Sequence, residues 1–407
     1  MFPGVSGKVF ALTLWDPDAS GPEPELLIVS GRFDLAGDVP VNNIAAWDGT
    51  QWQSMGGGMT AAYPFVGAVQ ALTVFKGELV AAGEFSSAGG VPADRIARWD
   101  GAQWHPLGDG LNNLVGALQV YDDELIAGGW FTMAGDTTAE KIARWDGTQW
   151  HSVGTGMSDA VAVLAVYRGE LIAGGEFSFA EGATVNEIAR WNGTRWFPLG
   201  EPVSGMSGGW PTVRALTVYN RELIVGGEFS GAGGGPANNI ARWDGSQWRS
   251  LGTGVNNAVE TLAVYNGELA AGGWFTTAGG AAAKYVARWD GAGWQALGSG
   301  VGGGDRYVYA LQRFGAELIA GGGFTLAGGS ASPYLARWGR GGVFGDADGD
   351  QSVTLADFRG WIMCSRGPAA ADAAAASSAG CLCMFNTDGD ADVDLADWAA
   401  FQNAFGR

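Results

Sequence analysis

Oxygen-bearing side chains recur at regular spacing in two segments near the end of the chain. The first segment reads D-A-D-G-D-Q-S-V-T-L-A-D from residue 346, and the second reads N-T-D-G-D-A-D-V-D-L-A-D from residue 386. Both place oxygen side chains at positions 1, 3, 5, 9 and 12 of a twelve-residue loop. This spacing wraps oxygens around one point, as the hard cation Ca²⁺ requires.

The register of the two loops predicts the metal ligands. They are Asp346, Asp348, Asp350, the carbonyl of Ser352, Thr354 and Asp357 in the first loop, and Asn386, Asp388, Asp390, the carbonyl of Asp392, Asp394 and Asp397 in the second. A single acidic loop is usually a solvated turn, but two copies in the same register predict two Ca²⁺ sites. Position 6, a glycine in EF-hands, is Gln351 or Ala391, which we expect to weaken affinity.

Each loop continues into a segment with helical periodicity. L-A-D-F-R-G-W-I follows the first loop and L-A-D-W-A-A-F-Q follows the second, with apolar residues at matching positions. The duplicated loop–helix pattern resembles the type I dockerins and is similar to the tails of secreted planctomycete proteins. The resemblance covers residues 344–407 and implies a small α-helical domain with two EF-hand-type calcium loops.

The same resemblance implies docking onto a cohesin-like protein or another surface or scaffold protein. Loop positions 10 and 11, a Ser-Thr-like pair in many dockerins, read Leu355-Ala356 and Leu395-Ala396, so the partner's identity stays open.

The only cysteines, Cys364, Cys381 and Cys383, also fall in this tail. Cys364 can pair with either of the others in an extracellular protein, and three reduced thiols are the alternative.

Residues 1–343 are dominated by a repeat. The tryptophan that opens W-D-G or a variant of it recurs at intervals of 46 to 52 residues, at Trp47, Trp99, Trp145, Trp191, Trp243, Trp289 and Trp338. Residues 117–154 show the order within one repeat: A-L-Q-V-Y, D-D-E, L-I-A-G-G-W-F, a polar loop, K-I-A-R-W, D-G and T-Q-W-H-S-V-G. The pieces predict four short strands, with turns at D-D-E or x-G-E and at Asp-Gly or Asn-Gly.

Seven four-strand units of this length predict an all-β, seven-bladed β-propeller, with an open β-solenoid as the alternative. A strand that ends in Gly-Gly and a later Trp pair, as in L-I-A-G-G from Leu171 and Trp191 with Trp196, resembles the kelch and galactose-oxidase propeller superfamily. The G-G-x-F and I-A-x-W-D-G runs are similar to the propeller of fungal cortical polarity markers. We expect Trp pairs five residues apart to share a face and brace the outer hairpin.

The two ends of the repeat region differ from its middle. After Trp338 the last repeat has no second tryptophan and therefore no clear fourth strand. The start, G-V-S-G-K-V-F-A-L from Gly4, matches the stretch that follows a fourth strand elsewhere and lacks the features of a signal peptide. We therefore expect the natural product to begin further upstream, with a signal peptide and a strand that closes the ring.

Two charged positions recur in most repeats. An acid follows the first hairpin turn and an arginine precedes the repeat tryptophan; they are Glu78, Glu124, Glu170, Glu222, Glu268 and Glu317, and Arg98, Arg144, Arg190, Arg242, Arg288 and Arg337. A group that recurs in this way is more often scaffold than site, so we expect these arginines to pair with the acids or stack on tryptophan. His105 and His151 occupy a variable outer slot, which also favours a structural role.

The residue x of G-G-x-F differs between repeats. It is Arg32, Glu84, Trp130, Glu176, Glu228, Trp274 or Gly323. If this position faces the central opening, Trp130 and Trp274 with nearby acids suit a glycan or a peptide. Packing against the next blade is the alternative.

Charge and hydropathy narrow the functions. The net charge of −19 at pH 7 repels phosphate backbones, so nucleic acid is not an expected partner. No apolar run approaches the ~20 residues of a membrane span.

We favour a secreted, non-enzymatic binding or display protein that docks through its calcium-dependent tail. The alternative is a carbohydrate-active enzyme, a glycoside hydrolase or lyase tethered by the tail, which requires an asymmetric pair of carboxylates ~5–9 Å apart in a pocket.

Overall fold

The computed structural model describes residues 4–19, 21, 23–61, 67–200, 203–204 and 212–339. The regular elements in this part of the chain are β-strands. The chain divides into two compact units, Met1–Phe314 with Ile319–Ala336, and Gly315–Leu318 with Arg337–Arg407. Within the second unit, Arg337 Nη1 lies 3.4 Å from Glu317 Oε2. The expected calcium loops, their helices and the three cysteines lie outside the described residues.

One order of strands recurs along the described residues, in six four-stranded antiparallel sheets and one three-stranded sheet. The first three sheets are β1 (Lys8–Trp15), β2 (Leu26–Arg32), β5 (Ile44–Trp47) and β6 (Trp52–Ser54); β8 (Ala68–Phe75), β9 (Glu78–Glu84), β12 (Ile96–Trp99) and β13 (Trp104–Pro106); and β14 (Val115–Tyr121), β15 (Glu124–Gly129), β18 (Ile142–Trp145) and β19 (Trp150–Ser152). The next two are β20 (Val161–Tyr167), β21 (Glu170–Gly175), β24 (Ile188–Trp191) and β25 (Trp196–Pro198); and β27 (Thr212–Tyr219), β28 (Glu222–Glu228), β31 (Ile240–Trp243) and β32 (Trp248–Ser250). The last two are β33 (Val259–Tyr265), β34 (Glu268–Gly273), β37 (Val286–Trp289) and β38 (Trp294–Ala296); and β40 (Val308–Phe314), β41 (Glu317–Gly322) and β44 (Leu335–Gly339).

Two-residue strands form small ladders in the loops between these longer strands. They are β3 (Leu35–Ala36), β4 (Val39–Pro40), β7 (Met59–Thr60), β10 (Ser87–Ala88), β11 (Val91–Pro92), β16 (Met133–Ala134), β17 (Thr137–Thr138), β22 (Phe179–Ala180), β23 (Ala183–Thr184), β26 (Val203–Ser204), β29 (Gly231–Ala232), β30 (Gly235–Pro236), β35 (Thr277–Ala278), β36 (Ala281–Ala282), β39 (Val301–Gly302), β42 (Leu326–Ala327) and β43 (Ser330–Ala331). Three of these ladders, such as β10 and β11 with β7, also include a strand that lies between the fourth strand of one sheet and the first strand of the following sheet.

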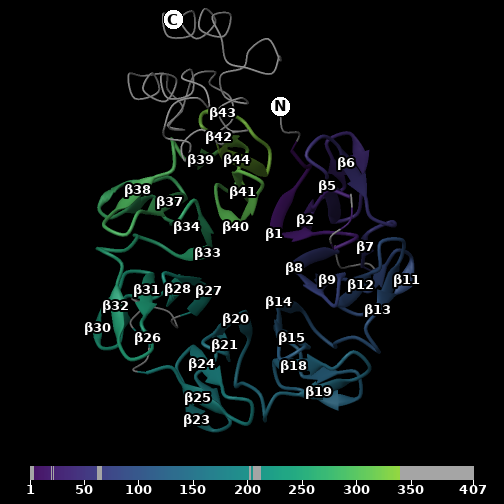
Figure 1. Ribbon diagram of the computed structural model, residues 1–407, viewed down its shortest axis with the longest axis horizontal. Helices are drawn as coiled ribbons and strands as arrows, with labels where there is room; N and C mark the ends of the chain where they lie inside the picture. The colour runs from purple at the N-terminus through teal and green to yellow at the C-terminus, as the bar shows by residue number, and fades with distance from the viewer. Residues whose placement is uncertain are drawn as a thin grey trace, which may run out of the picture. The chain divides into compact units, whose positions relative to one another are not determined.

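The first strands of the sheets line a central opening within the first unit (Figure 1). Each contacts the first strands of its two neighbours, in the order β1, β8, β14, β20, β27, β33, β40 and back to β1. The fold is therefore all-β and propeller-like, and its ring closes where β1 meets β40. The last sheet has three strands in the described residues, and the chain that follows β44, where a fourth strand would lie, is outside them, so the expectation for the last repeat stays a prediction.

The core lies between neighbouring sheets. The second strand of each sheet is an apolar run, such as L-I-A-G-G in β21, which is buried from Leu171 to Gly175. One core cluster joins Ala117 and Ile126 of one sheet to Leu164 and Leu171 of the next. Because each sheet is covered on both faces, its strands lack the polar alternation of a half-exposed sheet.

Tight turns occur where the sequence predicts them. Asp122 and Asp123 between β14 and β15 have φ of 52° and 59°, as a two-residue hairpin turn requires. In the outer hairpin, Gly101 has φ of 101°, and Asp100 Oδ1 accepts hydrogen bonds of 2.8 Å from the backbone N–H groups of Ala102 and Gln103. The Asx-type bonding of the aspartate and the conformational freedom of the glycine explain the recurrence of Asp-Gly.

The tryptophan pairs brace the outer hairpins as predicted. Trp99 and Trp104 are directly opposite in register, and their ring centroids are 5.2 Å apart. The indole N–H of Trp104 also donates a 2.8 Å hydrogen bond to the backbone carbonyl of Met55 in the preceding repeat. Four further tryptophans repeat this bond; they are Trp150, Trp196, Trp248 and Trp294. The second tryptophan therefore ties its sheet to the preceding repeat as well.

The recurrent arginines pair with the recurrent glutamates, as one of the two expected arrangements predicts. Arg190 Nη1 donates to Glu170 Oε1 at 2.7 Å, and Arg242 and Arg288 make equivalent bonds. His105 Nε2 lies 2.7 Å from Asp100 Oδ2 of the adjacent turn, and His151 makes the matching contact with Asp146. These groups are parts of the scaffold.

Candidate functional site: the central cavity

A β-bulge interrupts the first strand of six sheets at the same point. In β20, for example, the pairing shifts between Val161 and Val163, which leaves Ala162 as the extra residue. The bulged residues are Phe10, Gln70, Gly116, Ala162, Arg214 and Glu260. Tyr309 of β40 holds the matching sequence position. Bulges redirect side chains, and here they give one residue from each sheet a shared location.

A glycine beside each bulge makes the close approach of the two strands feasible. A Cβ atom on Gly175 would lie 2.1 Å from the carbonyl oxygen of Ala160, the residue immediately before the bulged strand β20. Equivalent glycines occur in all the sheets, at Gly31, Gly83, Gly129, Gly175, Gly227, Gly273 and Gly322. This steric requirement explains the second glycine of the G-G-x-F motif.

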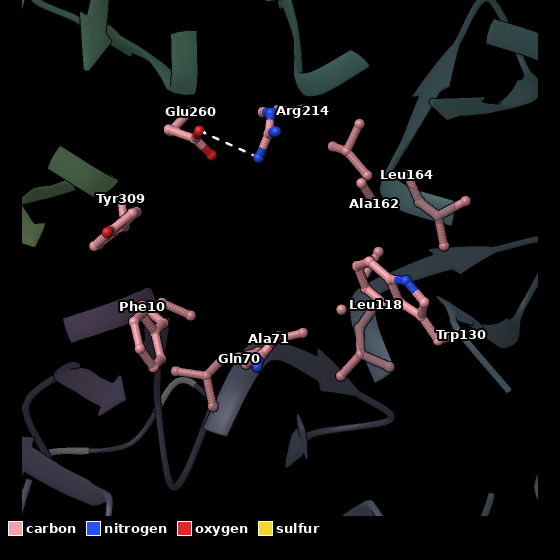
Figure 2. A pocket seen from close by; sticks show the side chains of 15 residues that line it. Phe10, Gln70, Ala71, Leu118, Trp130, Ala162, Leu164, Arg214, Glu260 and Tyr309 are labelled. Atoms are coloured by element: carbon pink, nitrogen blue, oxygen red, sulfur yellow. Dashed lines mark ion pairs between the residues drawn. The ribbon is translucent and has the colours of Figure 1, made fainter. Parts of the chain in front are cut away.

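The bulged residues and Tyr309 line a cavity of about 440 Å³ on the central opening (Figure 2). This volume falls within the range of about 300–1,000 Å³ that is common for small-ligand sites. The scaffold around the cavity is repetitive, but its wall is not. Arg214 and Glu260 form a charged side, and the small residues Gly116 and Ala162 form another part of the wall.

Aromatic rings occupy two parts of this wall. Phe10 and Tyr309 lie next to each other, with ring centroids 5.7 Å apart in an edge-to-face arrangement. Trp130 lies in another part of the wall, and its side chain covers Gly116, where a Cβ atom would be 3.1 Å from the Trp130 ring. Trp130 remains 36% exposed, so its ring is available to a ligand.

Arg214 contacts two glutamates through ion pairs. Its Nη1 lies 3.4 Å from Glu260 Oε1, and its Nη2 lies 3.7 Å from Glu228 Oε2. Within the described part of the chain Arg214 donates no hydrogen bond, and its Nε is buried without a partner. The scaffold arginines do hydrogen-bond their glutamates, so the guanidinium of Arg214 is the one whose donors are available at the cavity.

The protein environment shifts the pKa of two groups in the wall. Burial raises the pKa of Glu260, and the guanidinium of Arg214 opposes that rise. Burial also raises the pKa of the Tyr309 phenol to about 12, with a further contribution from the charge of Glu260. Tyr309 is therefore neutral at physiological pH and can both donate and accept hydrogen bonds.

The residues singled out at position x of G-G-x-F have different surroundings. Trp130 lines the cavity, as expected for a residue that faces the central opening. Trp274 instead stacks on Tyr307, the residue before β40 of the next sheet, with ring centroids 4.5 Å apart, as the packing alternative predicts. Glu228 joins Arg214, and Arg32 Nη2 lies 3.8 Å from Glu84 Oε2.

The bulged residues themselves were not identified from the sequence. Their signal is the run V-x-A-L, or a close variant, that opens each repeat, as in V-R-A-L from Val213 and V-Y-A-L from Val308. The residue before x is always Val and the residue after it is Ala, Val or Thr, while x changes from Phe to Gln, Gly, Ala, Arg, Glu and Tyr. A position that varies inside an otherwise regular strand marks the place where symmetry is broken.

The described residues contain no cluster of three or more His, Cys, Asp or Glu side chains that could hold a metal ion. The expected calcium ligands belong to the undescribed tail. Across the described part of the chain, no helix has the length and apolar character needed to cross a bilayer.

Sheets of this order around a central opening define a β-propeller domain, of a kind whose function is unknown. The family model "Domain of unknown function (DUF5122) beta-propeller" matches residues 77–99 and 220–243. Each matched segment contains the second and third strands of one sheet, β9 with β12 and β28 with β31. No curated protein matches the chain significantly.

Solved structures provide remote similarities. The computationally designed Ika8 protein is 17% identical, with 78% of this chain and 82% of that chain covered and a TM-score of 0.44. The WD40 beta propeller domain of Doa1 is 13% identical, with coverages of 79% and 92% and a TM-score of 0.46. The extracellular domain of the putative hybrid two component system BT4673 from B. thetaiotaomicron is 12% identical over 85% of this chain and 40% of that chain, with a TM-score of 0.49. At these TM-scores the similarities carry no functional argument.

Proposed function

We propose that this protein is a non-enzymatic binding protein whose propeller holds a small ligand in the central cavity. The observation that supports this proposal is the broken symmetry of the bulged positions. Seven equivalent positions carry seven different residues, including the ion pair of Arg214 and Glu260, whereas the glycine beside the bulge recurs in all seven sheets and the tryptophan pair in six. A cavity with only a structural role has no need of this variation.

The fold proposal is a seven-bladed β-propeller of the kelch type. The closed order of first strands from β1 to β40 supports seven blades. The recurrent Gly-Gly and tryptophan pairs support the kelch-type resemblance.

For the tail we propose a dockerin-like module with two calcium sites at the loops that start at Asp346 and Asn386. The duplicated spacing of oxygen ligands supports this part. The module attaches the propeller to a cohesin-like or other scaffold protein. Calcium loops and a cysteine pair both suit an extracellular protein, so we place the molecule outside the cell.

A carbohydrate-active enzyme remains the alternative. Glu260 lines the cavity, and a second carboxylate, Glu228, lies 3.7 Å from Arg214 Nη2. Burial raises the pKa of Glu260, as a general acid requires. Both carboxylates, however, pair with the same guanidinium, and that arrangement favours binding over catalysis. Hydrolysis or cleavage of a bound saccharide by the purified chain would overturn the non-enzymatic proposal.

Thermal unfolding of the full chain with a ligand panel tests the binding function. The panel contains neutral, acidic and basic oligosaccharides and short peptides. At a concentration of 100 Kd a ligand stabilises the folded protein by about 2.7 kcal/mol, so we expect a clear rise in Tm with at least one class.

A cavity-filling variant locates the binding. Gly116→Leu places a large side chain in the wall beside Trp130 and should abolish the rise in Tm. Gly293→Leu is the matched control, because its added Cβ would meet no atom within 4 Å. If both variants retain the shift, the ligand binds elsewhere and the proposal is wrong.

A further inference from the structure

The donors of Arg214 restrict the chemistry of the ligand. A guanidinium has five N–H donors and no acceptor, and Arg214 makes no hydrogen bond in the described part of the chain. Its side chain is 31% exposed toward the cavity. An ammonium ligand offers no acceptor for these donors, whereas a hydroxyl, carboxylate or phosphate oxygen does.

The two carboxylates beside Arg214 narrow the choice further. Glu228 and Glu260 both lie within 4 Å of the guanidinium, so an anionic group approaching it would meet two negative charges. A hydroxyl group avoids this repulsion. It can accept a hydrogen bond from Arg214 and donate its own proton to a neighbouring carboxylate at the same time.

The aromatic part of the wall favours a ligand that also has an apolar face. Trp130 is 36% exposed, and the small side chains at positions 116 and 162 leave space in its part of the wall. The C–H face of a sugar ring packs well on an indole ring, while the hydroxyl groups at its edge remain free for polar partners. Phe10 and Tyr309 offer a second aromatic surface to the same ligand.

We infer that the cavity ligand is a neutral saccharide, bound by hydrogen bonds from Arg214 to its hydroxyl groups and by packing of a sugar face on Trp130. This inference rests on the proposed binding function and names its ligand class. The wall combines a donor array, flanking acceptors and apolar surfaces, and a neutral saccharide complements all three. Acidic and basic ligands complement only part of it.

Calorimetric titration of the full chain tests the class. The neutral probes are the tetrasaccharides of cellulose, xylan, mannan and amylose, and the charged probes are tetragalacturonate and tetraglucosamine. We expect measurable binding with at least one neutral probe, and at least tenfold weaker binding of both charged probes.

Two variants connect the binding to the wall. Arg214→Gln removes the guanidinium donors, and Trp130→Ala removes a ring that is 36% exposed. Each should weaken binding of the neutral probe at least tenfold. The matched controls are Arg249→Gln and Phe179→Ala, which change an exposed arginine and an exposed aromatic residue away from the cavity and should leave the Kd unchanged.

The outcomes separate the two proposals. If a charged oligosaccharide or a peptide binds most tightly, and that binding depends on Arg214 and Trp130, the saccharide inference is wrong and the binding function stands. If no probe binds, or if neither variant affects binding, both are wrong. Circular dichroism on each variant shows whether a loss of binding reflects a loss of fold.

Discussion

A single buried acid distinguishes one repeat from the others at the residue scale. Seven equivalent positions before the third strand adopt positive φ; they are Asn43, Arg95, Lys141, Glu187, Asn239, Tyr285 and Tyr334. The side chains of the Asn, Arg and Lys residues donate hydrogen bonds to backbone carbonyls. Glu187 has no donor when ionised, is only 4% exposed, and its Oε2 has no hydrogen-bond partner in the described structure.

Burial raises the pKa of Glu187 to about 7, so its charge makes stability depend on pH. The raised folded-state pKa means that the folded protein keeps a proton that the unfolded chain releases above pH ~4.5. The contribution of the neutral acid is complete below pH ~4.5 and is lost as the pH rises through about 7. Ionised Glu187 therefore destabilises the fold at alkaline pH.

We expect Glu187→Gln to stabilise the protein at pH 8 by about 2–3 kcal/mol relative to its effect at pH 5, on the scale of 1.36 kcal/mol per pKa unit. Urea unfolding at the two pH values measures the difference. Glu176→Gln, at an exposed position in the same repeat, is the control and should show no such dependence. Equal effects of Glu187→Gln at both pH values would contradict the assignment.

At the element scale, the glycine beside each bulge controls the geometry of the cavity wall. The pairing of β20 with β21 shifts next to Gly175, where a Cβ atom has no room against the carbonyl of Ala160. Because the obstacle is backbone, the strands must separate to admit a side chain. The bulge and the direction of residue 162 depend on this glycine.

We expect Gly175→Ala to lower the free energy of unfolding by more than about 2 kcal/mol, in the range typical of steric strain in a core. Gly293→Ala should change it by less than about 0.5 kcal/mol, because that position has a permissive φ and open surroundings. Guanidinium unfolding of the two variants provides the comparison. A small effect of Gly175→Ala would mean that the bulge adapts without strain.

At the scale of the whole molecule, the two ends of the polypeptide have different proposed tasks. We propose that the propeller binds a ligand in its cavity and that the tail supplies a calcium-dependent attachment. The chain carries 42 acidic and 23 basic side chains. The carboxylates of the two tail loops are closely spaced in the sequence, so we expect them to repel one another until a cation binds. We therefore propose that the tail docks only after calcium has bound.

We expect the full chain to bind two Ca²⁺ ions in calorimetric titration after treatment with a chelator. Asp348→Ala and Asp388→Ala should each remove one site, because each deletes a carboxylate ligand from one loop. Asp372→Ala changes an acid of the tail outside both loops and should retain two sites. Titration without heat, or unchanged stoichiometry in both loop variants, would exclude the proposed sites.

Much of the scaffold is predictable from the sequence because the same pattern of residues recurs in each repeat. The Asp-Gly turns, the facing Trp99 and Trp104, and the pairing of Arg190 with Glu170 all follow from local spacing and recur in the structure. The bulges do not follow in this way, because a one-residue shift in pairing depends on how two strands fit together. The sequence places Trp130 and Trp274 at the same position of the repeat and gives no sign that their surroundings differ. In the structure Trp130 lines the cavity, whereas Trp274 stacks on Tyr307.

By itself, the sequence determined the class of fold, the order of strands within a repeat and the residues that brace each sheet. Those features depend on neighbours within about fifty residues, and the residues that produce them recur in each repeat. Only the tertiary structure decided which of the varying residues share one cavity. Phe10 and Tyr309 are almost 300 residues apart in the sequence, and they meet because the ring closes between β1 and β40.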